Sequence, residues 1–102
     1  ALPATALAEG CYDSMFYGCY NLGTGSQMPV ISATTPATNA LRYMFYNCEN
    51  LDKIKIALMS DPSDSGVYYY WAAYVKSSGT LYVPTGSTVN AMVPSGWSKS
   101  TY

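Results

Sequence analysis

The chain has 102 residues, of which only 11% are charged, and its formal net charge is −1. A chain of this length forms one domain or a piece of one, and the lack of a basic patch argues against nucleic acid as a partner. Its 11 tyrosines and few charges are more typical of extracellular modules than of cytosolic enzymes, because tyrosine suits half-buried and binding surfaces.

One phrase occurs twice, in residues 12–22 and in residues 41–51. Six positions are identical at a constant offset of 29 residues, and such a period predicts structural repeats that stack on one another. The apolar spacing i, i+1, i+4 and i+7 indicates a helical face that leads into a strand. The identical pairs are Met15/Met44, Phe16/Phe45, Tyr17/Tyr46, Cys19/Cys48, Asn21/Asn50 and Leu22/Leu51.

The first unit is expected to cover about residues 1–27. Thr5 is a candidate cap for a short helix. Leu7, Cys11 and Met15 then recur every four residues, which is helical spacing and predicts that they face inward.

The second unit is expected to cover about residues 28–56, with a helical segment over about residues 37–47. It ends in residues 51–56, whose last positions alternate between apolar and polar as in a half-buried strand. Lys53 and Lys55 are the polar residues of this pattern, so we expect both side chains to point outward.

The third, divergent unit is expected to cover about residues 57–83, and it opens with a polar loop over residues 60–66. Asp61, Ser63 and Gly66 match three positions of a calcium-binding loop, but Ala72 stands where that loop needs a bidentate Glu. Helix capping and turn chemistry explain the loop better than a metal does.

Residues 67–75 are the most apolar stretch, and their pattern fits either a strand or a helix. We favour a short helix because the stretch follows a strand and a loop. The pattern of residues 80–83 predicts a strand, and Pro84 ends it. Residues 84–102 are expected to form a C-terminal cap in which Trp97 covers the last layer of the core.

The three cysteines are an odd number, which argues against a disulfide framework. We expect Cys19 and Cys48 to be buried free thiols on neighbouring units, and a disulfide between Cys11 and Cys19 is the alternative. The chain has no histidine and no Cys-x-x-Cys motif, so we expect no metal site and no cofactor.

Nothing in the sequence points to catalysis. An enzyme needs a proton shuttle or an activated nucleophile. Here histidine is lacking, the six carboxylates fall in predicted loops or exposed positions, and no phosphate loop or dinucleotide motif occurs. No apolar run approaches the length of a membrane span.

Several phrases together resemble the BspA-like leucine-rich-repeat surface proteins of anaerobic bacteria. They are Leu2-Pro-Ala-Thr-x-Leu, the repeated Tyr-x-x-Met-Phe-x-x-Cys-x-x-Leu, Ser78-Gly-Thr-Leu-Tyr-Val-Pro and Val93-Pro-Ser-Gly-Trp97. The resemblance implies an α/β repeat fold, a leucine-rich-repeat solenoid with short strands, short helices or turns and a C-terminal cap. It also implies an exported protein at the cell surface, lipid-anchored in a longer precursor, that adheres to host or matrix proteins. The chain departs from the family in its long second unit and its few repeats.

Binding is therefore the function that the sequence predicts, with no catalysis and with a monomeric chain. The main hypothesis is a cell-surface protein-interaction or adhesion module. The alternatives are a carbohydrate-binding module that uses the aromatic stretch from Tyr68 to Tyr74, and a purely structural cap of a longer repeat array. The rings could instead only pack between units. The candidate binding residues are Tyr68, Tyr69, Tyr70, Tyr74, Lys53 and Lys55.

Overall fold

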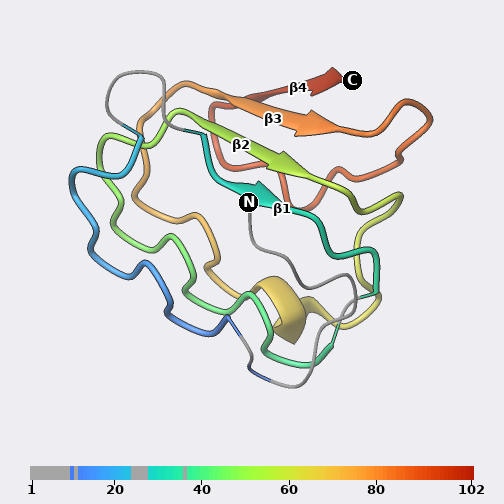
Figure 1. The fold of residues 1–102 in the computed structure, drawn as a ribbon, viewed down its shortest axis with the longest axis horizontal. Coiled ribbons are helices and arrows are strands. Elements are labelled where there is room, and N and C mark those ends of the chain that lie inside the picture. Colours follow the sequence, from blue (N-terminus) through green and yellow to red (C-terminus); the bar gives the residue numbers. More distant parts are fainter. Residues whose placement is uncertain (1–9, 11, 24–27, 36) are drawn as a thin grey trace.

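The computed structural model describes residues 10, 12–23, 28–35 and 37–102. Four short parallel strands form one sheet in the order β1-β2-β3-β4, so each strand pairs with the next one along the chain. The connections pass below the sheet as seen in Figure 1 and contain one short 3-10 helix, η1. The elements are β1 (Val30–Ile31), β2 (Lys53–Ile56), η1 (Ser65–Tyr68), β3 (Thr80–Val83) and β4 (Ser98–Thr101).

The two central strands follow the alternation of their side chains. In β2 the isoleucines Ile54 and Ile56 are buried and the lysines are half-buried. β3 repeats this pattern, with Leu81 and Val83 buried. The strands predicted at the end of residues 51–56 and over residues 80–83 are confirmed. β4 was not predicted, because its Ser-Lys-Ser-Thr sequence has no apolar residue and it joins the sheet through backbone pairing with β3.

Three segments made of consecutive turns lie side by side and are joined by backbone hydrogen bonds. These turn segments are residues 12–22, 37–51 and 64–75. Alternate N–H groups of the first segment donate to the second, as from Phe16 to the Met44 carbonyl oxygen at 2.9 Å. The second segment donates to the third in the same way, as from Phe45 to the Trp71 carbonyl oxygen at 2.7 Å. Many intervening N–H groups bond three residues back in their own segment, so each segment is a run of tight turns.

Positive backbone φ angles recur every four residues in these segments and exclude an α-helix there. They occur at Gly10, Ser14 and Gly18, at Asn39, Tyr43 and Asn47, and at Tyr70 and Tyr74.

The predicted helix over residues 37–47 is therefore wrong, and the one favoured over residues 67–75 is reduced to the 3-10 turn of η1. Apolar residues four apart fit a helical face, but they fit a run of turns with a four-residue period equally well. The capping role of Thr5 and the inward positions of Leu7 and Cys11 lie outside the described residues.

The expected α/β fold, a leucine-rich-repeat solenoid with short helices, is corrected by these findings. The chain forms a compact body of 29 × 27 × 23 Å, so no axis is markedly longer than the others. In the part of the chain that the structure describes, a four-stranded parallel sheet packs against the three turn segments, and η1 is the only helix.

The core lies between the sheet and the turn segments. Phe45 and Leu51 from the second segment are fully buried, as are Ile54 and Leu81 from the sheet. Trp97, predicted to close the core, is buried and donates its indole N–H to the Lys76 carbonyl oxygen at 2.8 Å. The two copies of the repeated phrase differ in environment, because the middle segment is covered on both sides. Met44 is fully buried, whereas Met15, which we expected to face inward, is 51% exposed.

The cysteines differ in the same way. Cys19 is exposed and Cys48 is buried, and both are free thiols, so the expected pair of buried thiols holds only for Cys48. The Cys48 thiol donates to the Phe16 carbonyl oxygen at 3.0 Å. Burial is the main cause that raises the pKa of the Cys48 thiol to about 11. Cys11 and its disulfide alternative lie outside the described residues.

We expect alkylation of the folded protein near pH 8 to label Cys19 and to spare Cys48, because the thiolate is the reactive form. The raised pKa favours the folded state below the ordinary thiol pKa of 9.0, and this contribution is lost as the pH rises from there through about 11. Peptide mapping by mass spectrometry after alkylation reads each site. Alkylation in urea, which should label Cys48 too, is the control, and equal labelling of both thiols in the folded protein would contradict the burial of Cys48.

Candidate binding surface

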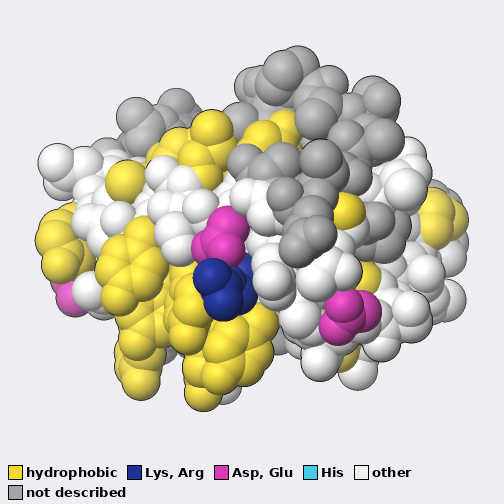
Figure 2. All heavy atoms as spheres, turned by 90° about the horizontal axis from the view of Figure 1, so that it is seen from below, with side chains coloured by type: hydrophobic (Ala, Val, Ile, Leu, Met, Phe, Trp, Pro, Cys, Tyr) yellow, Lys and Arg dark blue, Asp and Glu magenta, His cyan; other side chains and the backbone are white. Residues whose placement is uncertain are grey.

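Six tyrosines from all three turn segments form one aromatic cluster, which we call the tyrosine surface. Neighbouring rings lie between 4.5 and 6.4 Å apart, measured between ring centroids. Four of the six side chains are strongly exposed, with Tyr74 the most exposed at 68%. Figure 2 shows that hydrophobic side chains gather on one face of the molecule around a basic and an acidic side chain. The members are Tyr17, Tyr43, Tyr46, Tyr69, Tyr70 and Tyr74.

The rings are held in fixed mutual orientations by the register of the turn segments. Tyr17 stacks on Tyr46 with centroids 4.9 Å apart and an angle of 15° between the ring planes. Tyr46 in turn meets Tyr74 edge to face at 5.3 Å. Offset-stacked and edge-to-face pairs are the favourable geometries for aromatic rings. The rings of the tyrosine surface therefore support one another through favourable pair geometries.

Three of these tyrosines occupy backbone conformations that L-residues avoid. The φ angles of Tyr43, Tyr70 and Tyr74 are 51°, 46° and 57°. Tyr69, with φ −56° and ψ 118°, and Tyr70 have the φ angles of a type II turn, whose second central position favours glycine or asparagine. A bulky side chain there costs roughly 1–2 kcal/mol. Such strain tends to cluster at functional sites, so exposed tyrosines at these positions point to a role outside folding.

One ion pair borders the tyrosine surface. Arg42 pairs with Asp13 at 3.0 Å, and its guanidinium carbon lies 5.7 Å from the ring centroid of Tyr43.

Removal from water, with further contributions from Tyr74 and Tyr17, raises the pKa of the Tyr46 hydroxyl above its ordinary value of 10.0.

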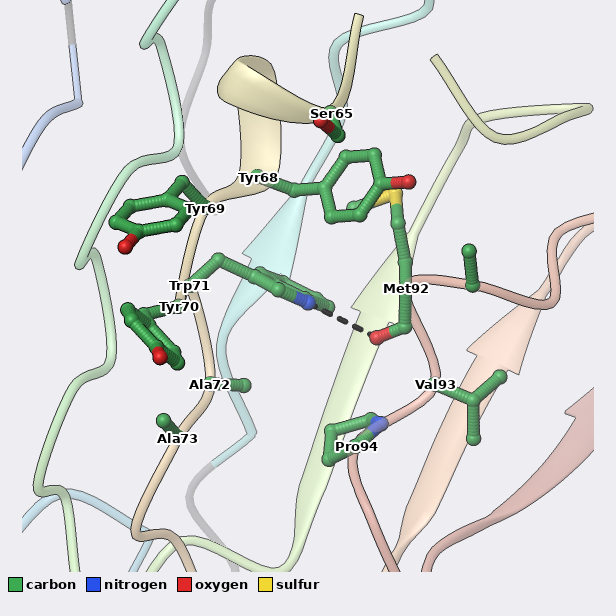
Figure 3. A pocket seen from close by; sticks show the side chains of 11 residues that line it. Ser65, Tyr68, Tyr69, Tyr70, Trp71, Ala72, Ala73, Met92, Val93 and Pro94 are labelled. Carbon is green, nitrogen blue, oxygen red and sulfur yellow. Dashed lines mark hydrogen bonds between the residues drawn. The ribbon is translucent and has the colours of Figure 1, made fainter. Parts of the chain in front are cut away.

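The structure separates the predicted binding residues into three places. Tyr69, Tyr70 and Tyr74 belong to the tyrosine surface. Tyr68 points away from it, toward Met92 (Figure 3). Lys53 and Lys55 are half-buried residues of β2, and the Lys55 ammonium lies 4.2 Å from the ring centroid of Tyr102.

Sequence reasoning missed half of the tyrosine surface, namely Tyr17, Tyr43 and Tyr46. A signal was present, because Tyr17 and Tyr46 occupy the same position of the repeated phrase. The exposure of Tyr17, and the half-buried positions of Tyr43 and Tyr46 beside it, could not be predicted, since the phrase was interpreted as one buried helical face.

An open groove of about 350 Å³ lies between the third turn segment and residues 91–94. Trp71 extends across it, and its indole N–H donates to the Met92 carbonyl oxygen at 2.9 Å (Figure 3). The opposite wall is residues 91–94, which the Asp61 carboxylate holds by accepting backbone N–H bonds from residues 90–92. No side chain that lines the groove carries a formal charge at neutral pH.

Comparison with known proteins identifies no relative: no protein-family model, curated protein or solved structure matches the chain. Among the described residues, no three His, Cys, Asp or Glu side chains gather in a group that could hold a metal ion. No helix in that part of the chain combines the length and the hydropathy needed to cross a membrane.

Proposed function

We propose that the chain is a non-catalytic protein-interaction module that binds its partner through the tyrosine surface. The observation that carries the proposal is the gathering of six tyrosines, three of them in unfavourable left-handed conformations, on one exposed face. A location at the cell surface and an adhesive role are part of the proposal, and their support is the resemblance of the sequence to BspA-like surface proteins.

A protein partner fits this surface better than a sugar does. A sugar stacks on an open ring face, but Tyr17 and Tyr46 cover one face of each other, and so do Tyr43 and Tyr70. Only Tyr69 and Tyr74 have no stacked partner within the tyrosine surface. Tyrosine in such settings supplies much of the binding energy of protein interfaces at a low cost in side-chain entropy. A glycan partner and a purely structural capping role remain the alternatives.

The lysines of β2 are a weaker candidate for the binding site. The ammonium of Lys55 is already placed over the ring of Tyr102, whose hydroxyl donates to the Ile56 carbonyl oxygen at 2.7 Å. An anionic partner would have to compete with this contact. We therefore assign the main binding role to the tyrosines and keep Lys53 and Lys55 as a secondary prediction.

Replacing both Tyr70 and Tyr74 by asparagine should weaken binding strongly while changing the stability of the fold little. Asparagine tolerates positive φ, so the change relieves backbone strain of roughly 1–2 kcal/mol per residue. This relief offsets the loss of the ring pairs that Tyr70 and Tyr74 make with Tyr43, Tyr46 and Tyr69, each worth about 0.5–1.5 kcal/mol. Loss of two interface tyrosines should weaken binding by about tenfold or more. Surface plasmon resonance against a panel of matrix proteins and mucins measures the affinity, and thermal unfolding measures the stability.

Tyr20→Asn is the matched control, because Tyr20 is 54% exposed yet is not part of the tyrosine surface. The control should bind as the unchanged protein does. Binding to a glycan array with none to the protein panel would support the carbohydrate alternative instead. Undiminished protein binding by the double variant would remove the tyrosine surface from the proposal.

A further inference from the structure

A simple rule of backbone hydrogen bonding joins the turn segments. In the second segment Leu41, Tyr43, Phe45 and Asn47 each donate an N–H to a carbonyl oxygen of the third, at 2.7 to 3.0 Å. Donors two residues apart therefore form a row along one edge of a segment. The first segment donates to the second through the same kind of row.

The third segment continues this row, but no neighbour among the described residues accepts its hydrogen bonds. The left-handed residues Tyr43 and Asn47 correspond to Tyr70 and Tyr74, so the equivalent donors are the N–H groups of Tyr70, Ala72 and Tyr74. Within the described part of the chain, these three N–H groups have no hydrogen-bond acceptor. A row of unpaired donors at a structural edge is a template for another backbone.

The open groove lies beside the part of this edge that carries Tyr70 and Ala72, and Tyr74 follows just beyond its lining. Its walls are residues 68–73 of the third segment and residues 91–94, and Trp71 extends between them (Figure 3). On the far wall Ala91 is exposed and Val93 is half-buried, and these two residues supply the accessible apolar surface. The groove is continuous with the tyrosine surface, because Tyr69 and Tyr70 contribute to both.

We propose that this edge binds an extended, uncharged peptide segment of the partner protein. Carbonyl oxygens of the peptide accept hydrogen bonds from the N–H groups of Tyr70, Ala72 and Tyr74. Apolar side chains at alternate positions of the peptide lie against the half-buried Tyr68 and Val93. The proposal rests on the proposed function, in that the partner is a protein, but it concerns a different set of contacts.

The chemistry of the edge and the groove selects this occupant. The edge offers neutral donors at every second residue, and the carbonyl groups on one side of an extended chain also recur at every second residue. The groove has no charged lining side chain that would neutralise a buried charge of the ligand, and an unpaired buried charge is costly. Backbone bonds supply affinity in such complexes, and the apolar contacts supply selectivity.

A titration followed by two-dimensional ¹H–¹⁵N NMR tests the proposal, with the acetylated and amidated peptide Thr-Val-Thr-Val-Thr-Val-Thr as the probe. The amide signals of Tyr70, Ala72 and Tyr74 should shift, and their hydrogen exchange should slow several-fold. The amides of Tyr43, Phe45 and Asn47 should stay unchanged, because they already donate to the third segment. An unchanged spectrum at millimolar peptide, or shifts confined to other residues, would overturn the proposal.

Two variants and one dilution series complete the test. Ala91→Trp fills the groove from an exposed wall position and should abolish the shifts, whereas Ser95→Trp, exposed but outside the groove, should preserve them. Equal shifts in both variants would place the peptide elsewhere and overturn the proposal. Shifts at these amides that depend on protein concentration without peptide would identify a second copy of the chain as the occupant and also overturn it. The double variant Tyr70→Asn, Tyr74→Asn keeps the backbone N–H donors. If it still binds the peptide but no longer binds the partner protein, the edge and the tyrosine surface are separate binding sites.

Discussion

Replacement of Phe45 by alanine is expected to lower the free energy of unfolding by about 3–5 kcal/mol, which is the usual cost of removing a buried aromatic ring. Phe45 is fully buried in the middle turn segment. Its ring stacks on Phe16 at 5.5 Å on one side and meets Trp71 at 5.9 Å on the other. The substitution therefore leaves a cavity that faces all three segments, and their shared backbone ladder limits how far they can close it.

Phe16→Ala is the matched control, because Phe16 occupies the equivalent position of the repeated phrase but is only partly buried. Its loss should cost less than half as much as that of Phe45. Equilibrium denaturation in urea, followed by tryptophan fluorescence, measures both free energies. Equal losses would mean that the middle segment has no special place in the core.

The strands could be predicted where burial and sequence pattern agree. Residues 53–56 and 80–83 alternate cleanly because one face of the sheet is buried and the other is not. β4 could not be predicted, since its residues are mostly exposed and its place in the sheet depends on backbone pairing with β3.

The helices were wrongly predicted because the deciding property is a backbone angle that the apolar pattern does not report. Gly18 and Asn47 tolerate positive φ and were available as signals for turns. Tyr43, Tyr70 and Tyr74 carried no such signal, because tyrosine rarely adopts that conformation. Of these three residues, Tyr70 and Tyr74 present their rings to solvent, and Tyr43 is half-buried.

The candidate surface was partly predictable for the same reason. Tyr69, Tyr70 and Tyr74 stood out as a local run of aromatic residues. Tyr17, Tyr43 and Tyr46 join them only through the side-by-side placement of segments far apart in the sequence. The binding hypothesis depends on this three-segment surface, which no single stretch of the sequence displays.

The loop that contains Asp61 is stabilised by its carboxylate, and Asp61→Ala should lower the free energy of unfolding by about 2 kcal/mol, within the range for hydrogen bonds to charged groups. The two carboxylate oxygens accept N–H bonds from Asn90, Ala91 and Met92 at 2.9 to 3.1 Å. Alanine leaves all three donors to water, and the wall of the groove that Met92 forms loses its anchor. Hydrogen exchange should speed up at residues 90–92 and at the Trp71 indole N–H, which bonds to the Met92 carbonyl oxygen.

Asp64→Ala supplies the comparison for Asp61, because Asp64 lies in the same loop and accepts a single backbone N–H bond, from Gly66 at 2.9 Å. Its loss should cost about 1 kcal/mol, as for other N-cap residues, and should leave exchange at residues 90–92 unchanged. Denaturation in urea and hydrogen exchange of both variants decide the matter. If Asp64→Ala lowers the free energy of unfolding more than Asp61→Ala does, the loop is stabilised mainly at the start of η1. If Asp61→Ala has the larger effect, as we expect, the Asp61 carboxylate is what holds the far wall of the groove in place.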